Sequence, residues 1–431
     1  MKSIRDVLRG NLLIFTLGDV FRQLSMFITF PYFSLYIRAL GGSTVDIGLV
    51  NTFRPLAALF IYPIAGYLSD RYSRVKTIVV AGYISAALYL IFMLAPDWRF
   101  LAIGNFLMGL MVFIFPAMNA LMADSLPPQQ RGIGYSLWLL FPSVVGILSP
   151  FVGGYLITVL GVEQAMRVLY GWTILTGVGI STMYLKFLRE HRMGTKPSIP
   201  GREGFRVVLD AYRDMFDVLR WLPRSLKAFT LMLMLSFFVN NIVTPYWVVY
   251  AVGRIGLNEL QWGTVLLVAA IVNVSLLVPA GMIVDRFGVK KILSFALALS
   301  FVPTFLYPFS HSFIETIFLF VVMTIANVFL SSGAPAFMAH SVPTDKRGRV
   351  MAALGQGMLF VNTRGGSGGP GMGAVLAIPS VLGSFLGGFV YNYNSTLPWI
   401  LLAVSMIINT LISIFFLASP DKTPALASHS G

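Results

Sequence analysis

The sequence predicts an all-α membrane protein whose twelve transmembrane helices form two pseudo-symmetric six-helix bundles, and three observations support this fold class. First, 57% of the 431 residues are hydrophobic and only 11% are charged, whereas an ordinary soluble domain is about 25% charged. Second, twelve apolar stretches are each long enough to cross about 30 Å of hydrocarbon. Third, segments of the first half recur in the second half. Most of the surface is therefore expected to face lipid.

The predicted spans follow one another with mostly short connections. They are expected at 11–40, 45–69, 76–96, 99–125, 132–160, 166–188, 226–253, 259–284, 290–309, 313–341, 371–392 and 396–418. The first stretch continues to Leu40 without a small-residue cleavage site, so it is interpreted as a span and not as a signal peptide.

Lys and Arg residues are distributed unevenly between the two sides of the predicted membrane. With both termini inside, all but six of the 31 basic residues lie on cytoplasmic segments. Because basic residues favour the cytoplasmic side, we expect both termini in the cytoplasm and a multi-pass protein of the plasma membrane. The net charge of +14 then reflects topology. Nucleic-acid binding is not expected, since it would need a soluble basic face.

An internal repeat organises the chain. The segment GYLSDRYSRVKTI at 66–78 returns as GMIVDRFGVKKIL at 281–293, and further identities keep the same order at displacements of 214 to 216 residues. They include Pro31 with Pro245, Tyr32 with Tyr246, Ala123 with Ala339 and Arg131 with Arg347. Many secondary transporters are built from such repeats, with the substrate site between them near the bilayer midplane. The expected layout is an N-terminal bundle (1–190), a cytoplasmic linker (191–225), a C-terminal bundle (226–420) and a cytoplasmic tail (421–431).

Two segments have no counterpart in the repeat. Residues 204–222 place apolar and charged side chains on opposite helical faces, which predicts an amphipathic linker helix on the inner membrane surface. The second half also carries a glycine-rich insertion, Asn362–Gly373, which lacks the flanking strand and Lys-Ser or Lys-Thr of a phosphate-binding loop. It is either a surface loop or a break in span 11, because unwound backbone within the bilayer must line a cavity or be buried in protein.

No residue pattern indicates an enzyme. The sequence has no cysteine, and its four histidines are scattered, so neither a metal site nor a cofactor is predicted. No Ser/His/Asp arrangement or carboxylate pair stands out either.

The two Asp-Arg segments resemble the hallmark loop of the major facilitator superfamily, which reads roughly Gly-x-x-x-Asp-Arg-x-Gly-Arg-Lys/Arg. The matching residues are Gly66, Asp70, Arg71, Arg74 and Lys76 in the first copy, and Gly281, Asp285, Arg286, Gly288 and Lys290 in the second. Ser73 replaces the second glycine of the pattern. The resemblance extends over nearly the whole chain and implies the major facilitator fold, with transport by alternating access.

In that family the loop is a conformational latch, and the resemblance carries this role to Gly66, Asp70, Arg71, Arg74, Asp124, Asp285 and Arg286. Asp70 is expected to face the positive N-terminal end of span 11, and Arg71 to pair with Asp124 at the end of span 4. These contacts would favour the outward-facing state. His340 stands where the first half has Asp124, so we expect the second latch to be weaker.

Span 5 contains GILSPFVGG, which resembles the antiporter motif of exporters in the family. The matching residues are Gly146, Pro150, Gly153 and Gly154, whereas Ser149 departs from the motif. The resemblance implies export. The alternative is simple helix packing, since small residues allow close approach and Pro150 would bend the span.

Three ionisable residues fall well inside the predicted spans: Asp19, Arg22 and Arg54. A charge at the bilayer centre costs about 3 kcal/mol on insertion scales, so these side chains should face water, one another or a ligand. The repeat has apolar or hydroxyl residues at the equivalent positions, which favours a function over a fold requirement. A structural ion cluster remains the alternative.

Further polar or aromatic residues are placed on the cavity wall by the family pattern, in which spans 1, 4, 7 and 10 line the pathway. They are Asn105, Asn119, Asn240, Asn241, Tyr246 and Asn327, with Thr244 and Ser331 beside them. For each, helix packing is the alternative interpretation.

The leading hypothesis is a secondary transporter that exports a small amphipathic or drug-like molecule in exchange for protons, with Asp19 carrying the proton. The first alternative is uptake or exchange of an organic anion bound by Arg22 and Arg54. A non-transporting membrane sensor is the second. The expected partners are the small-molecule substrate, protons and the lipid bilayer, and the protein is expected to act as a monomer.

Overall fold

The structure is a computed structural model that describes residues 8–71, 73–127, 131–190, 213, 217, 219–342, 347–363, 365 and 372–418. Twelve helical segments in this part of the chain are long and apolar enough to cross a membrane. Their bounds lie within a few residues of the predicted spans, apart from the second, whose qualifying segment is Thr44–Tyr62 although its helix continues to Arg71. The predicted linker helix falls largely outside the described residues.

The N-terminal bundle contains the first six spans. They are α2 (Gly10–Thr29) with η1 (Phe30–Tyr32) and α3 (Phe33–Ala39); α4 (Thr44–Arg71); α5 (Arg74–Met93); α6 (Trp98–Leu110) with η2 (Met111–Phe113) and α7 (Ile114–Ser125); α8 (Arg131–Val145) with η4 (Gly146–Leu148) and α9 (Ser149–Leu160); and α10 (Val162–Phe187).

The C-terminal bundle repeats this order. Its helices are α12 (Arg224–Val243) with η5 (Thr244–Tyr246), α13 (Trp247–Tyr250) and η6 (Ala251–Ile255); α14 (Glu259–Phe287); α15 (Val289–Leu306) with η7 (Tyr307–Phe309); α16 (Phe313–Ser341); the short α17 (Arg347–Leu354); α18 (Ala374–Tyr393); and α19 (Leu397–Phe416).

The repeat is visible in the local breaks of the first span of each bundle. Pro31 lies in the 3₁₀ turn η1, and the equivalent Pro245 lies in the 3₁₀ turn η5. Proline has no N–H to donate to the preceding turn and clashes with it, so each helix tightens or bends at this point. The sequence identity between the halves is therefore also an identity of backbone shape.

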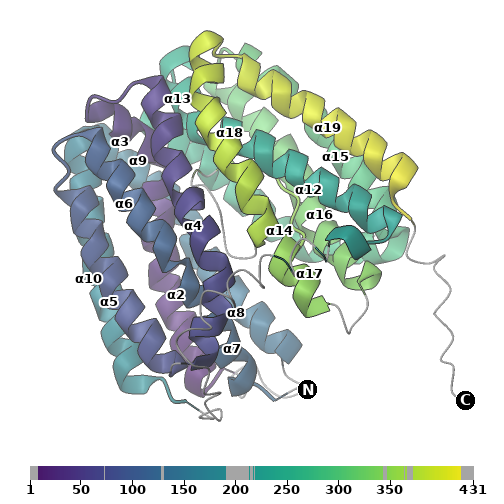
Figure 1. Ribbon diagram of the computed structural model, residues 1–431. Coiled ribbons are helices and arrows are strands. Elements are labelled where there is room, and N and C mark those ends of the chain that lie inside the picture. Colours follow the sequence, from purple (N-terminus) through teal and green to yellow (C-terminus); the bar gives the residue numbers. More distant parts are fainter. Residues whose placement is uncertain are drawn as a thin grey trace, which may run out of the picture.

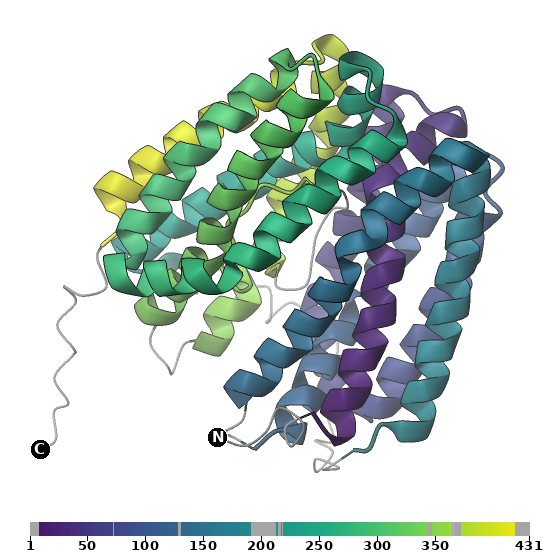
Figure 2. The ribbon, with the colours of Figure 1, turned by 180° about the vertical axis from the view of Figure 1, so that it is seen from behind.

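The two bundles lean against each other at one end of the molecule and diverge at the other (Figures 1 and 2). The first helix begins and the last helix ends at the open side, which we call the terminal end; the opposite side is the far end. Two helix pairs join the bundles, because α4 packs along α18 and α9 packs along α14. We call the region between the bundles, which contains a cavity lined by residues of both, the central space.

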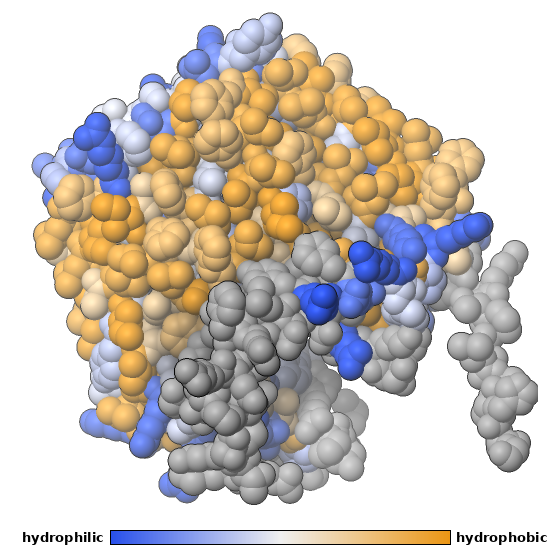
Figure 3. All heavy atoms as spheres, viewed as in Figure 1, coloured by the Kyte–Doolittle hydropathy of each residue, from blue (hydrophilic) through white to orange (hydrophobic). Residues whose placement is uncertain are grey.

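The outer surface is apolar over most of its height (Figure 3). Large side chains such as Leu175, Val278 and Ile314 are 66 to 77% exposed. Water would penalise so large an apolar surface, whereas acyl chains would cover it without cost. The protein is therefore an integral, multi-pass membrane protein.

The described residues between α17 and α18 are non-helical. They are 355–363, 365, 372 and 373, which we call the inserted segment. Gly355 and Met372 form an antiparallel bridge, so the two ends of the segment lie side by side. Leu359 and Val361 are buried. Most of the predicted insertion Asn362–Gly373 lies outside the described residues, so whether it is a surface loop or a break in span 11 stays a prediction, while span 11 itself begins at Ala374.

Candidate substrate cavity

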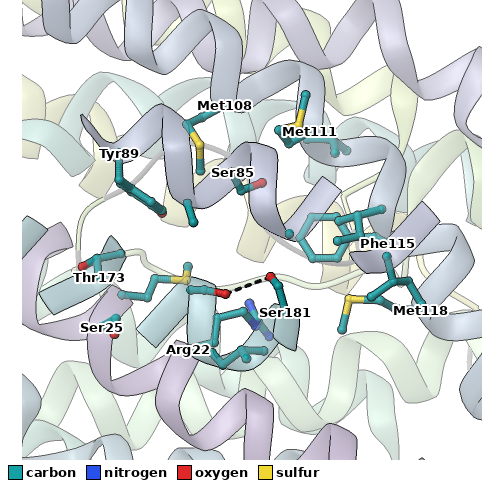
Figure 4. Close-up of a pocket in the computed structure, with 18 of the residues that line it drawn as sticks. Arg22, Ser25, Ser85, Tyr89, Met108, Met111, Phe115, Met118, Thr173 and Ser181 are labelled. Carbon is teal, nitrogen blue, oxygen red and sulfur yellow. Dashed lines mark hydrogen bonds between the residues drawn. The ribbon is translucent and has the colours of Figure 1, made fainter. Parts of the chain in front are cut away.

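A cavity of about 200 Å³ is lined by residues of the N-terminal bundle together with Met372 of the inserted segment. Figure 4 shows Met108, Met111 and Met118 facing Arg22 and Ser25 across it. Further lining residues are Met26, Phe30, Arg54, Tyr62, Tyr89, Phe115, Thr176, Tyr184 and Met372. The wall is thus mostly thioether and aromatic, with a small number of charged and hydroxyl groups. Such a wall suits a flexible or varied apolar ligand with one polar end.

Asp19 and Arg22 form an ion pair at the edge of this cavity. The Nε atom of Arg22 donates to Oδ1 of Asp19 over 2.8 Å, one helical turn away on α2. The Asp19 side chain is 7% exposed, whereas that of Arg22 is 39% exposed. The pair therefore hides the carboxylate and presents the rest of the guanidinium to the cavity.

Arg54 lies on the wall of the same cavity but has no such partner. Its guanidinium carbon sits 5.3 Å from the centre of the Phe30 ring, a cation–π distance. Among the described residues, no carboxylate lies within ion-pair distance of Arg54. Because the Asp19–Arg22 pair is neutral as a unit, Arg54 gives this cavity a net positive charge.

A second cavity, of about 420 Å³, lies on the C-terminal side of the central space. Its wall is uncharged and rich in amides and hydroxyls: Ser236, Asn240, Asn241, Thr244, Asn273, Thr324, Asn327, Ser331 and Asn362. Met26, Phe30 and Met372 line both cavities, so the two are neighbours. Among the described residues, no group of His, Asp or Glu gathers as metal ligands would.

The predicted cavity residues differ in what they contact. Asn240 and Asn327 line the second cavity, but their amides are bonded to the inserted segment. Asn241 lines it too and donates to the carbonyl of Phe237. Asn105 is buried and donates to the carbonyl of Val50, a packing contact between α6 and α4.

Two predicted residues lie away from the larger cavities. Asn119 is exposed on α7 and lines neither of them. Tyr246 is fully buried near the far end, where it bonds to α4.

Met108, Met111 and Met118 and the aromatic residues of the N-terminal cavity were not predicted. Apolar residues of these types fill every span, so nothing in the sequence separates a cavity wall from a lipid face or a packed core. The repeat offers a signal in retrospect. Met108, Met111 and Phe115 stand 216 positions before Thr324, Asn327 and Ser331, which line the other cavity.

Glycines bring the bundles together at the far end. A Cβ atom at Gly48 of α4 would lie 2.7 Å from the backbone nitrogen of Gly388 in α18, and one at Gly388 would lie 2.7 Å from the carbonyl oxygen of Val45. Real Cβ atoms do not approach backbone so closely. Only glycine therefore permits this contact, which closes the central space at the far end.

The antiporter-like motif belongs to the other far-end contact. The 3₁₀ turn η4 begins at Gly146, and Pro150 lies in the first turn of the next helix, α9, so the α-helix of span 5 is interrupted beside this proline. A Cβ atom at Gly153 would lie 2.5 Å from the carbonyl oxygen of Ile28, and one at Gly154 would clash with the carbonyl of Glu259 at the start of α14. The motif thus packs helices within the N-terminal bundle and across to the C-terminal bundle.

Two tyrosines at equivalent positions of the repeat connect the two bundles at the far end. The Tyr32 hydroxyl donates to the carbonyl of Pro150 over 2.6 Å and lies 3.3 Å from the carbonyl of Glu259 in the other bundle. The Tyr246 hydroxyl donates to the carbonyl of Thr44 in the other bundle over 2.9 Å. Both side chains are completely buried. Each bundle therefore extends one tyrosine toward a backbone carbonyl of its partner.

The predicted latch residues lie at the terminal end. Asp124 is paired with Arg74, while the side chains of Gly66, Asp70 and Arg71 lie outside the described residues. The expected pairing of Arg71 with Asp124 thus remains a prediction.

Ser73, which replaces the family's glycine, is the N-cap of α5. Its hydroxyl contacts Glu190, and Glu190 also accepts the backbone N–H of Arg74 over 2.8 Å. The described contacts of the first latch therefore stay inside the N-terminal bundle.

The second copy of the latch is less connected. Asp285 and Arg286 are exposed at the end of α14, and no ion pair of either is found within the described part of the chain. His340 contacts the carbonyl of Ala336 on its own helix. The expectation that the second latch is the weaker one stays a prediction.

Twelve spans in two repeated bundles, closed at one end around a central cavity, define the class of secondary membrane transporters. The sequence pattern of the Major Facilitator Superfamily matches residues 15–362. The chain belongs to this family, whose members are transporters and not enzymes.

Comparisons with individual proteins are more distant. The chain is 26% identical to Multidrug resistance protein MdtH of Yersinia enterocolitica, over 93% of this chain and 92% of that protein. It is 21% identical to an uncharacterized MFS-type transporter of Methanocaldococcus jannaschii, over 95% of each. Solved structures of a POT family transporter in complex with a thioalcohol-conjugated peptide and of the nucleoside transporter NupG share the fold. Their TM-scores are 0.69 and 0.65 at 13% identity, covering 94% of this chain and 96% and 98% of theirs.

Proposed function

We propose that the protein exports small amphipathic molecules in exchange for protons. The observation that carries the proposal is the cavity of the N-terminal bundle, where a thioether and aromatic wall meets a buried carboxylate–guanidinium pair. An apolar wall accepts ligands of varied shape, while the pair offers a site where protonation and ligand binding would compete. The similarity to a protein named for multidrug resistance supports export.

The orientation follows from the distribution of basic residues. With the terminal end in the cytoplasm, the central space opens inward and the far-end contacts of α4 with α18 and α9 with α14 close it outward. Opening outward would then require these glycine contacts to separate while the latch residues at the terminal end come together. We place the protein in the plasma membrane and propose that it acts as a monomer, since the cavities are built within one chain.

Asp19 is the proposed proton carrier. While the Asp19 carboxylate is ionised, its pair with Arg22 holds the remaining N–H groups of the guanidinium toward the cavity, where they would bind an anionic substrate group. When the carboxylate is protonated, the ion pair is lost, the guanidinium is no longer held in this position and the substrate is released. Proton and substrate would thus exclude each other, as exchange requires.

Everted membrane vesicles test this proposal. A fluorescent arene carboxylate and the matching uncharged arene amide are supplied outside, and uptake into the vesicle lumen is followed with and without a pH gradient. We expect wild-type uptake to depend on the gradient and Asp19→Asn to lose that dependence. Asp97→Asn is the matched control, because Asp97 caps α6 away from the cavity and asparagine caps equally well. Asp19→Asn transport equal to wild type across the gradient would refute the coupling role.

A second candidate function is uptake or exchange of an organic anion, and the unpaired Arg54 favours it. In that case the carboxylate would be moved and the amide would not, and counterflow would continue without a pH gradient. Gradient-independent exchange that vanishes in Arg54→Gln would select this function over proton-driven export.

A further inference from the structure

The inserted segment lines the second cavity together with the polar residues of the C-terminal bundle, and it is bonded to two of their amides. Asn240 donates to the carbonyl of Phe360 over 3.0 Å and accepts the N–H of Asn362 over 2.9 Å. Asn327 donates to the carbonyl of Val361 over 3.0 Å and accepts its N–H over 2.7 Å. Each amide thus binds a donor and an acceptor of the segment's backbone, as a neighbouring strand would.

These contacts lie deep in the molecule. Asn327 is the central residue of the 29-residue helix α16, about 21 Å from either end at 1.5 Å per residue. Thr244 donates to the carbonyl of Asn362 over 3.2 Å, close to the far-end closure. The segment also reaches the other bundle, because a Cβ atom at Gly365 would lie 2.5 Å from the carbonyl oxygen of Phe30. Non-helical backbone at this depth is satisfied by protein groups and not by water.

The repeat shows what the segment covers. Phe30 and Met111 line the N-terminal cavity, and the equivalent residues of the second half are Thr244 and Asn327. The first pair is apolar and open to the cavity, whereas the second pair is polar and bonded to the segment. The hydrogen-bonding capacity of these C-terminal residues is therefore directed toward the protein's own backbone.

We propose that the inserted segment is a built-in wall of the substrate cavity that binds the amides of Asn240 and Asn327 and narrows the C-terminal side of the central space, so that large substrates are excluded. The proposal rests on the proposed function for the identity of the ligand, an amphipathic molecule with an anionic group. Selectivity for size then comes from the segment, with Met372 on the wall of both cavities. Selectivity for charge comes from Arg54 on the opposite wall.

The bridge between Gly355 and Met372 makes the segment removable. Replacing residues 357–370 by Asn-Gly leaves four residues between the bridged ends, few enough for a hairpin loop, so α17 and α18 keep their connection. Asn327→Leu is a milder variant that removes one of the amide side chains bonded to the segment without shortening the chain. Asn273→Leu is its control, since Asn273 lines the same cavity and is not bonded to the described residues of the segment.

The first arm of the test needs no ligand, because the chain has no cysteine of its own. Thr244→Cys places a thiol under Asn362, and Ser331→Cys places one on the same wall where the described segment residues make no bond. On excision of the segment, we expect maleimide modification of Thr244→Cys to accelerate about tenfold or more, since covered groups react only through transient opening. Asn327→Leu should act in the same direction. The modification rate of Ser331→Cys should change little on excision. The modification rate of Thr244→Cys should also change little when it is combined with Asn273→Leu.

The second arm measures size selectivity by the fluorescence of arene carboxylates with two, three and four rings, bound to purified protein in nanodiscs. Wild type should prefer two rings to four by about tenfold, because a filled cavity resists overpacking. The excised variant should lose this preference and keep its affinity for the two-ring compound, since Arg54 is unchanged.

Unaltered modification of Thr244→Cys in a folded excised protein would overturn the proposal whatever the substrate is. Unaltered size preference would overturn it as well. If no carboxylate binds to wild type, the anionic substrate class is wrong, and the thiol arm alone decides whether the segment is the wall.

Discussion

The two walls of the central space descend from one repeated sequence but have opposite chemistry. At equivalent positions the N-terminal wall has Arg22 and Met26, where the C-terminal wall has Ser236 and Asn240. The first wall is charged and apolar, and its side chains face an open cavity. The second wall is neutral and polar, and its amides hold the inserted segment. The comparison teaches that symmetric helices can carry an asymmetric site. A side chain that lines a cavity can differ between the two halves without altering the packing that holds each bundle together.

The largest expected effect is on the ion pair of the N-terminal wall. Asp19→Ala removes the partner of Arg22 and should lower the free energy of unfolding by about 3 kcal/mol, at the low end for a buried pair because Arg22 is 39% exposed. Thermal unfolding in detergent measures this loss. Asp19→Asn keeps an acceptor for Arg22 and should recover part of it. Equal stability of wild type and Asp19→Ala would show that the ion pair does not contribute to the stability of the fold.

The corresponding change on the C-terminal wall is Asn327→Leu. It removes two hydrogen bonds and leaves the peptide groups of Val361 without their partner, so we expect a loss of about 2 kcal/mol by the same measurement. Asn273→Leu, on the same wall, should lose less. A loss from Asn327→Leu that exceeds that of Asp19→Ala would reverse the ranking of the two walls.

Ligand affinity should depend on the first wall alone. Arg54→Gln should weaken binding of an arene carboxylate about tenfold, since a charge-assisted hydrogen bond is replaced by a neutral one. The matching uncharged amide should bind Arg54→Gln and wild type alike. Equilibrium fluorescence titration of both ligands measures the difference, and an equal loss for both would mean that Arg54 shapes the cavity without binding charge.

The smallest effect is expected where the two halves remain symmetric. Tyr246→Phe removes a hydrogen bond between the bundles worth about 1 kcal/mol, so it should shift the population toward an open far end about fivefold. Tyr32→Phe should shift it less, because the 2.6 Å bond of Tyr32 to Pro150 lies within the N-terminal bundle and only its 3.3 Å contact with Glu259 crosses to the other bundle.

Spin labels on the exposed positions Arg99 and Tyr393, introduced as cysteines, would report this opening as a longer inter-bundle distance. A larger shift in Tyr32→Phe than in Tyr246→Phe would contradict the assignment of the two bonds.

The sequence alone determined the spans, the repeat and the family. The length of an apolar stretch and the basic residues beside it are local properties, and they govern how each segment inserts into the bilayer. They can therefore be recognised in the sequence without knowledge of tertiary contacts. The sequence also singled out Asp19, Arg22 and Arg54, because charge inside a span is rare enough to stand out. The interruption of span 5 beside Pro150 followed from the covalent geometry of proline.

Only the tertiary structure decided which neutral residues matter. Met108 and Met111 look like any lipid-facing methionine until helices from distant parts of the chain enclose a cavity around them. The amide of Asn327 could equally have met substrate, another helix or water; it meets Val361 because the inserted segment folds back into the space between the bundles. Contacts of this kind depend on where separate helices end up relative to one another, and that is fixed by packing and hydrogen-bond satisfaction across the whole molecule.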